Sequence, residues 1–262
     1  MIRRGSRAGL LAALALPLVC ASLSSAEVAQ KGNVRISVDG SLAPKKLPRS
    51  EAAPISVSVG GKISTTDGSE PPQLKALRVE INRHGRLDTT GLPVCSYHSI
   101  QPASTQRALA ACRNSLVGTG SFEVNVALPG QPPYPSKGKL LLFNGRKGRK
   151  PVIYGQIYAP RPFATSFVVV FAVRRIAGGN YGTELLARIP AELGSWGFIT
   201  GIQMRLSRQF GHAGRRHSFL SASCPAPKGF TQAPFPLARI SFRFARAGSL
   251  HSILMRTCGV RV

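Results

Sequence analysis

The sequence predicts a mainly β chain, folded as an antiparallel β-sandwich or as duplicated β-sandwich modules with one short helix. Two observations support this class. Apolar and polar residues alternate with period two in several short segments, as half-buried strands require, because successive side chains point to opposite faces of a sheet. Between these segments lie 27 Gly and 20 Pro, many of them in turn-forming clusters.

The expected strands are distributed along the whole chain. The alternating segments are Val34–Val38, Ile55–Val59, Leu77–Ile81, Phe122–Val126, Ile202–Leu206 and Ile240–Phe244. Leu140–Phe143 and Phe167–Val173 are instead continuously apolar, which indicates strands that are central in a sheet or covered on both faces. Turn signals such as Asn144-Gly145 separate the strands.

One segment, Ser104–Arg113, has the pattern of a helix. Ser104 or Thr105 is a suitable N-cap, and the residues that follow are good helix formers. This helix would carry Cys112 back toward Cys95 and lie as a flap, stapled by a disulfide, over the sheet.

The N-terminus has the profile of a cleavable signal peptide. Met1–Arg7 carries three arginines and no acid, and Ala8–Cys20 carries no charge. Ser24 and Ala26 provide the small residues of a cleavage site, so we expect residues 1–26 to be a Sec-type signal peptide. A membrane anchor is the alternative, but the apolar run is shorter than the roughly 20 residues that cross a bilayer. We therefore expect a secreted or cell-surface protein with no transmembrane segment after cleavage.

Four cysteines remain beyond the expected signal, an even number that is typical of disulfides in an exported protein. Three pairings are possible. Cys95 with Cys112 and Cys224 with Cys258 is favoured, because each pair closes a short local loop. Such loops, 17 and 34 residues long, contribute about 3 and about 4 kcal/mol in the chain-entropy treatment.

The two expected disulfides suggest two β modules. The first would span residues 27–145 and contain Cys95 and Cys112, and the second would span residues 146–262 and contain Cys224 and Cys258. The boundary would fall at a basic loop. One larger all-β domain is the alternative, because the length is compatible with either.

The chain is strongly basic, with 35 Lys and Arg against 10 Asp and Glu and a net charge of +25. The excess lies in the second half, where residues 124–262 contain 20 basic side chains and only Glu184 and Glu192 as acids. A field of this sign favours anionic partners. The alternative explanation is an arginine-rich genome that places Arg on every solvated surface.

Two turns concentrate these cations, and they form the candidate site for an anionic ligand. One is the loop Asn144–Lys150 between two strand-like segments, and the other lies near His212. The candidate residues are Arg146, Lys147, Arg149, Lys150, Arg215 and Arg216. Binding of this kind is salt-sensitive and independent of sequence. The alternative is that both turns are ordinary solvated hairpins.

Four short motifs resemble exported proteins of unknown function from high-GC Gram-positive bacteria. They are Ile55–Ile63, Gly91–Cys95, Trp196–Phe198 and Ser223–Phe230. The resemblance implies export and β structure, and it implies no activity.

Motifs for catalysis or metal binding are missing from the sequence. It contains no Gly-x-Ser-x-Gly, no His-Glu-x-x-His and no phosphate-binding loop. Ser136 and Lys139 make one isolated Ser-x-x-Lys match, and His212 and His217 flank a basic turn rather than metal ligands. We therefore predict no catalytic residue, no metal and no cofactor.

The expected function is non-enzymatic: adhesion, or binding to an anionic polymer or surface of the cell envelope, without specific nucleic-acid recognition. The alternatives are a small secreted hydrolase without a linear motif and a purely structural envelope protein. A deep pocket with Glu184 or Glu192 beside a histidine would favour the hydrolase, and a flat cationic face would favour binding. Tyr134, Tyr181 and Trp196 are candidates for stacking on sugars, with core packing as the alternative. The sequence leaves the oligomeric state open.

Overall fold

The computed structural model describes residues 26–161, 163–195 and 197–261. The predicted signal peptide therefore lies outside the described residues except for Ala26, as does Trp196. In chain order the strands are β1 (Glu27–Lys31), β2 (Val34–Ala43), β3 (Lys46–Leu47), β4 (Ala53–Pro54), β5 (Ser56–Thr65), β6 (Leu74–Asn82), β7 (Gly85–Leu87), β8 (Leu116–Val126), β9 (Tyr134–Lys147), β10 (Lys150–Ala159), β11 (Thr165–Arg175), β12 (Tyr181–Arg188), β13 (Gly197–Leu206), β14 (Gln209–His212), β15 (Arg215–Ser218), β16 (Leu220–Ala222), β17 (Gln232–Phe244) and β18 (Ser249–Val260). The helical segments are η1 (Tyr97–Ser99), α1 (Thr105–Cys112), η2 (Arg113–Ser115) and α2 (Ala191–Ser195).

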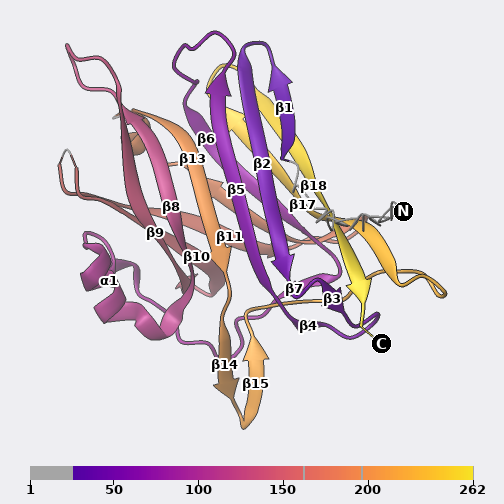
Figure 1. Ribbon diagram of the computed structural model, residues 1–262. Helices are drawn as coiled ribbons and strands as arrows, with labels where there is room; N and C mark the ends of the chain where they lie inside the picture. The colour runs from indigo at the N-terminus through magenta and orange to yellow at the C-terminus, as the bar shows by residue number, and fades with distance from the viewer. Residues whose placement is uncertain (1–25, 162, 196, 262) are drawn as a thin grey trace, which may run out of the picture.

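Thirteen of these strands form one continuous sheet. Its order is β1-β2-β5-β13-β8-β9-β10-β11-β12-β6-β17-β18-β3, and every pairing is antiparallel except that of β18 with β3. The prediction of a mainly β chain is confirmed. The sandwich arrangement is not confirmed, because hydrogen bonds join these strands into one large curled sheet (Figure 1).

The curl brings the first strand, β1, beside the last one, β18. The Glu27 carboxylate in β1 accepts hydrogen bonds from the Met255 backbone N–H at 3.2 Å and from Arg256 Nη1 at 2.7 Å, both in β18. Strands β1 and β18 are not neighbours in the sheet order. These side-chain hydrogen bonds therefore connect the two ends of the sheet.

The boundary expected between residues 145 and 146 falls within β9. Strands from both sides of it pair directly: β5 pairs with β13, and β6 lies between β12 and β17. Buried side chains from both sides also share one core, which extends from Val34 to Cys258.

Alternating polarity explains which side chains of each strand face the core. Val34 and Ile36 in β2 are buried in the core inside the curl, whereas Arg35 between them is exposed. Each of the eight segments predicted from the sequence overlaps one of the strands. The inner sheet face is therefore apolar, and the outer face carries most of the charge.

The apolar segment of β9 is covered on both faces, as the sequence predicts. Leu140 and Leu142 point into the core inside the curl, while Leu141 and Phe143 belong to a second cluster on the outer face. Helix α1 and the segment before it cover this second cluster, as the ribbon beside β9 and β10 shows (Figure 1).

The predicted helix and both predicted disulfides are confirmed. The Ser104 Oγ accepts a hydrogen bond from the Arg107 backbone N–H and thereby caps α1. Cys95 is bonded to Cys112, and Cys224 is bonded to Cys258. The first disulfide fastens α1 to the outer face of the sheet as a flap, because Cys95 and Cys112 both pack in the second cluster.

Two smaller sheets complete the fold. Strands β4, β16 and β7 form a three-stranded sheet, and β14 and β15 form a hairpin that projects from the body of the molecule (Figure 1). The three-stranded sheet is a lid over the inside of the curl, because its Leu220 and Ala222 belong to the inner core.

Candidate functional site

The cationic loop predicted at Asn144–Lys150 is the tip of the β9–β10 hairpin. Lys147 and Lys150 face each other across the tip, and Gly148 adopts a φ of +60°, which favours glycine. The Tyr154 hydroxyl donates a 2.6 Å hydrogen bond to the Arg146 carbonyl and fixes the start of the turn. All four predicted cations, Arg146, Lys147, Arg149 and Lys150, are exposed.

The second predicted turn is the tip of the β14–β15 hairpin. Arg215 faces His212 across the hairpin and Arg216 faces Gly211, and both arginines are exposed. His217 stacks on Phe210 with ring centroids 5.7 Å apart, and its Nδ1 lies 3.7 Å from Asp88 Oδ2. His217 is therefore engaged with an aromatic ring and a carboxylate, and the His212 ring lies edge-on to it with centroids 5.8 Å apart.

One loop, residues 89–95, links the two cationic hairpins. The Asn144 side chain in β9 donates hydrogen bonds to the carbonyls of Leu92 and Pro93 at 3.1 and 3.0 Å. Gly91 in the same loop lies against the His212 ring, so closely that an added Cβ would be 2.1 Å from His212 Cγ. The loop thus contacts both Asn144 in β9 and His212 in β14, which are more than sixty positions apart in the sequence.

A third cationic surface lies on the outer face of the sheet, where β12, β6, β17 and β18 run side by side. The register aligns Arg188 with Ala76 and Arg243, and it aligns Leu186 with Arg78, Ser241 and His251. These rows surround a hollow of about 520 Å³. We call it the arginine hollow; its basic residues are Arg78, Arg188, Arg239, Arg243 and His251.

The two carboxylates beside the arginine hollow, Glu80 and Glu184, each form an ion pair with an arginine. Glu80, which is 6% exposed, accepts a 2.7 Å hydrogen bond from Arg239 Nη2 and a second one from Arg239 Nε. This bidentate pair lowers the pKa of Glu80 against the opposing effect of burial. Glu184, which is 7% exposed, lies 3.4 Å from Arg78 Nε.

Arg188 and Arg243 are not paired with a carboxylate in the part of the chain that the structure describes. Both are exposed, and within the described part of the chain neither has a hydrogen bond or an ion pair. The Arg239 guanidinium is held on its other side by the Tyr181 ring, 4.9 Å from the ring centroid. The arginine hollow therefore combines fixed and free guanidinium groups on one surface.

Sequence reasoning missed the arginine hollow. Arg78 and Arg243 stand alone in their segments, and the pattern shows only that each points outward from its strand. Their proximity depends on the pairing of β6 with β17, which are separated by most of the chain. No local signal predicts that pairing.

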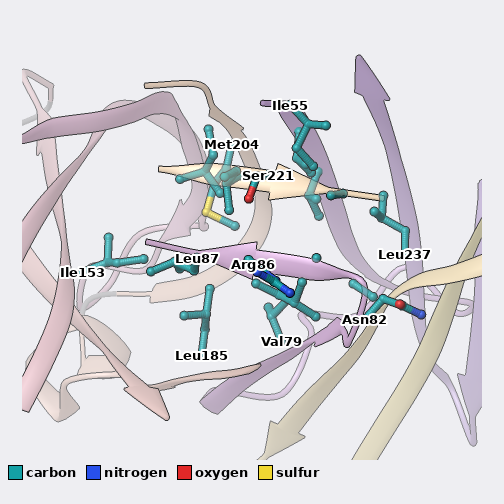
Figure 2. A pocket seen from close by; sticks show the side chains of 18 of the residues that line it. Ile55, Val79, Asn82, Arg86, Leu87, Ile153, Leu185, Met204, Ser221 and Leu237 are labelled. Atoms are coloured by element: carbon teal, nitrogen blue, oxygen red, sulfur yellow. The ribbon is translucent and has the colours of Figure 1, made fainter. Parts of the chain in front are cut away.

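An apolar cavity of about 80 Å³ lies inside the curl, beneath the three-stranded sheet. Side chains from β5, β6, β10, β12, β13 and β17 line it. Figure 2 shows Ile55, Ile153, Leu185 and Leu237 around the short strands β7 and β16.

The aromatic candidates have structural roles where they are described. Tyr134 is half-buried in β9, and Tyr181 packs under Arg239. Burial raises the pKa of the Tyr181 hydroxyl. Neither ring is an open stacking platform of the kind that a sugar site uses.

The arrangements that would suggest catalysis are poorly formed. Ser136 and Lys139 are three residues apart in β9, so their side chains point to opposite faces of the sheet. Ser223 Oγ lies 3.5 Å from His84 Nδ1, but Ser223 is only 5% exposed. Glu184 contacts an arginine rather than a histidine. Among the described residues no group of three His, Cys, Asp or Glu side chains is gathered as metal ligands.

Comparisons with known proteins find no match among protein families, curated proteins or solved structures. No helix within residues 26–161, 163–195 and 197–261 has the length and apolar character needed to span a membrane.

Proposed function

We propose that this chain is an exported, non-enzymatic β protein that binds an anionic polymer of the cell envelope through its cationic outer surface. The observation that carries the proposal is the arginine hollow. Arginines from three separate strands, β6, β12 and β17, line it, and two of them pair with the nearby carboxylates Glu184 and Glu80. Arg188 and Arg243 are left to bind anionic groups.

Polymer binding fits this surface better than binding of a single small anion. The arginine hollow is open, and its arginines are spread over three neighbouring strands rather than gathered around one point. A polyanion engages such a surface with several groups at once and releases counterions from each of them. The hairpin cations Arg146, Lys147, Arg149 and Lys150 remain a second candidate contact for the same polymer.

Export is part of the proposal. The basic and apolar segments at the N-terminus predict a signal peptide, and the two disulfides support an oxidising compartment, because disulfides persist outside the cytoplasm. A secreted or cell-surface location would bring the chain to the anionic polymers of an envelope.

Three matched double variants test the proposal on a dextran sulfate matrix. Arg188→Gln with Arg243→Gln removes the free cations of the arginine hollow. Arg149→Gln with Lys150→Gln removes two cations of the β9–β10 tip, and Arg35→Gln with Arg205→Gln removes two exposed strand arginines elsewhere. Each variant loses the same net charge.

We expect the hollow variant to elute at the lowest salt concentration. The slope of log affinity against log salt should become shallower by about 0.7 to 0.9 for each lost contact. The largest loss in the tip variant would move the site to the hairpin. Equal losses in all three variants would mean that net charge alone governs retention, and the proposal would be wrong.

A further inference from the structure

The cavity inside the curl is suited to an apolar group. Its lining is apolar or glycine except for Asn82, Arg86 and Ser221. Asn82 has both polar atoms engaged, since its Nδ2 donates to the Pro236 carbonyl and its Oδ1 accepts from the His84 backbone N–H, each at 2.9 Å. Water gains little in such a space, because an ordered water needs two to four polar partners.

The lid over the cavity is thin. Strands β4, β16 and β7 are only two or three residues long, and they are joined by five register pairs. Short strands with few hydrogen bonds belong to the parts of a fold that open most readily. The lid is therefore the natural entry route to the cavity.

The other face of the lid carries a cationic hollow. This hollow, of about 770 Å³, is lined by Arg83, Arg86, Arg175 and Arg216, and its one carboxylate, Asp88, lies beside His217. We call it the lid hollow. It is distinct from the arginine hollow, which lies on β12, β6, β17 and β18.

The apolar cavity and the lid hollow meet at the lid. Gly85, Arg86, Leu87 and Ser221 line both of them. In Figure 2, Arg86 and Ser221 lie on β7 and β16, and the apolar side chains Val79, Leu185 and Met204 surround them. An apolar site and a cluster of guanidinium groups are thus separated by the thickness of one small sheet.

We propose that this junction binds a small anionic amphiphile, a short acyl chain ending in a carboxylate. The chain would occupy the cavity, and the carboxylate would bind Arg86 and the neighbouring arginines of the lid hollow. Arg–carboxylate pairs are strong and directional, and apart from Asn82, whose polar atoms are engaged, the lining has only Arg86 and Ser221 as polar residues. Charge and polarity therefore both favour this class.

The size of the cavity limits the chain. Its volume of about 80 Å³ is roughly half that of an engineered cavity of ~150 Å³ that binds benzene. Half of that volume holds about three carbons, so the end of a hexanoate chain would fill the cavity while its remaining methylenes cross the lid to the carboxylate at Arg86. A long fatty acid would require the cavity to expand.

Calorimetric titration with acetate, butanoate, hexanoate, octanoate and hexanol tests the proposal. We expect affinity to rise about fourfold for each added methylene until the cavity is filled, as burial of CH₂ groups predicts. Hexanol should bind at least about tenfold more weakly than hexanoate, because it cannot form a charge-assisted pair. Affinity independent of chain length, or equal binding of hexanol and hexanoate, would overturn the proposal.

Variants then assign the two parts of the site. Ala238→Leu adds bulk to the cavity wall and should abolish hexanoate binding. Val79→Ile is a smaller addition to the same wall, and it should weaken binding even if the larger change prevents folding. Arg86→Gln with Arg216→Gln should weaken hexanoate about tenfold or more and hexanol little. The matched control, Arg149→Gln with Lys150→Gln, loses the same charge and should leave hexanoate affinity unchanged.

This site is independent of the proposed polymer surface, and the variants separate the two. Ala238→Leu should leave retention on dextran sulfate unchanged, and Arg188→Gln with Arg243→Gln should leave hexanoate binding unchanged. Unaltered hexanoate binding in both cavity variants, or an equal loss in the control pair, would show that the ligand binds elsewhere.

Discussion

Glu80 in β6 and Arg239 in β17 form a bidentate ion pair across adjacent strands, although 159 positions separate them in the chain. The two partners differ in exposure: the Arg239 side chain is 41% exposed and that of Glu80 only 8%. The guanidinium can therefore be solvated without its partner, whereas the carboxylate depends on it.

This asymmetry predicts unequal costs of removing the partners. Arg239→Gln leaves the buried Glu80 carboxylate without its partner and should lower the free energy of unfolding by about 2 kcal/mol. Glu80→Gln leaves a solvated arginine and should lower the free energy of unfolding by about 1 kcal/mol. Urea unfolding at neutral pH measures both, with Arg188→Gln as a control that should change stability little. A larger cost for Glu80→Gln than for Arg239→Gln would contradict this account.

The same pair predicts a pH dependence in the acidic range. Hydrogen bonds from Arg239 lower the pKa of folded Glu80 below its ordinary value of 4.5. Its stabilising contribution is therefore complete above that value and is lost as pH falls through the folded pKa. The stability difference between the native chain and Glu80→Gln should shrink as pH falls below about 4.5.

The difference measurement isolates Glu80 from other titrating groups. Burial lowers the pKa of His84, for example, so its titration also affects acid stability, but it does so equally in both proteins. A stability difference that stays constant down to strongly acidic pH would show that the pair does not contribute in this way.

The flap predicts a local effect of one disulfide. Cys95→Ala with Cys112→Ala should cost up to about 3 kcal/mol and should release α1 from Leu141 and Phe143 on the outer face. Hydrogen–deuterium exchange should then rise in residues 96–115. Cys224→Ala with Cys258→Ala is the comparison, and it should leave exchange in the flap low. Equal exchange in the two variants would mean that packing alone holds the flap.

Close approach of two strands makes Gly120 in β8 intolerant of a side chain. A Cβ at this position would lie 1.9 Å from the Gln203 carbonyl oxygen in β13, and backbone must move to relieve that overlap. Gly120→Ala should therefore lower stability by about 2 kcal/mol or more. Gly211→Ala, where nothing lies within 4 Å of the added carbon, should lower the melting temperature far less. Similar melting temperatures for the two variants would refute the steric argument.

Local features of this fold could be predicted from the sequence, and distant pairings could not. The alternation at Leu77–Ile81 shows that the side chains of Arg78 and Glu80 point to the same face of the sheet, away from the core. The loop between Cys224 and Cys258 is short enough to favour the correct disulfide. The cluster of cations at the β9–β10 tip can likewise be predicted from the sequence, because residues that are neighbours in sequence stay close together in a hairpin.

Neither the curled sheet nor the arginine hollow has such a local signature. Both depend on which strands pair and in what register, and a shift of one residue would turn Arg243 from the outer face to the core. That choice is made by the packing of side chains such as Val79 and Ile240, which face each other across β6 and β17, and not by either segment alone.

The contact between Glu27 and Arg256 has a consequence for how the chain reaches its final form. During synthesis β1 emerges long before β18, because 229 positions separate Glu27 from Arg256. The Glu27 carboxylate therefore lacks this partner until β18 has been made. Until then the outer edge of β1 is an open template for other strands. Completion of this sheet is thus tied to the arrival of β18, and a chain truncated before Arg256 would keep an unprotected and aggregation-prone edge strand.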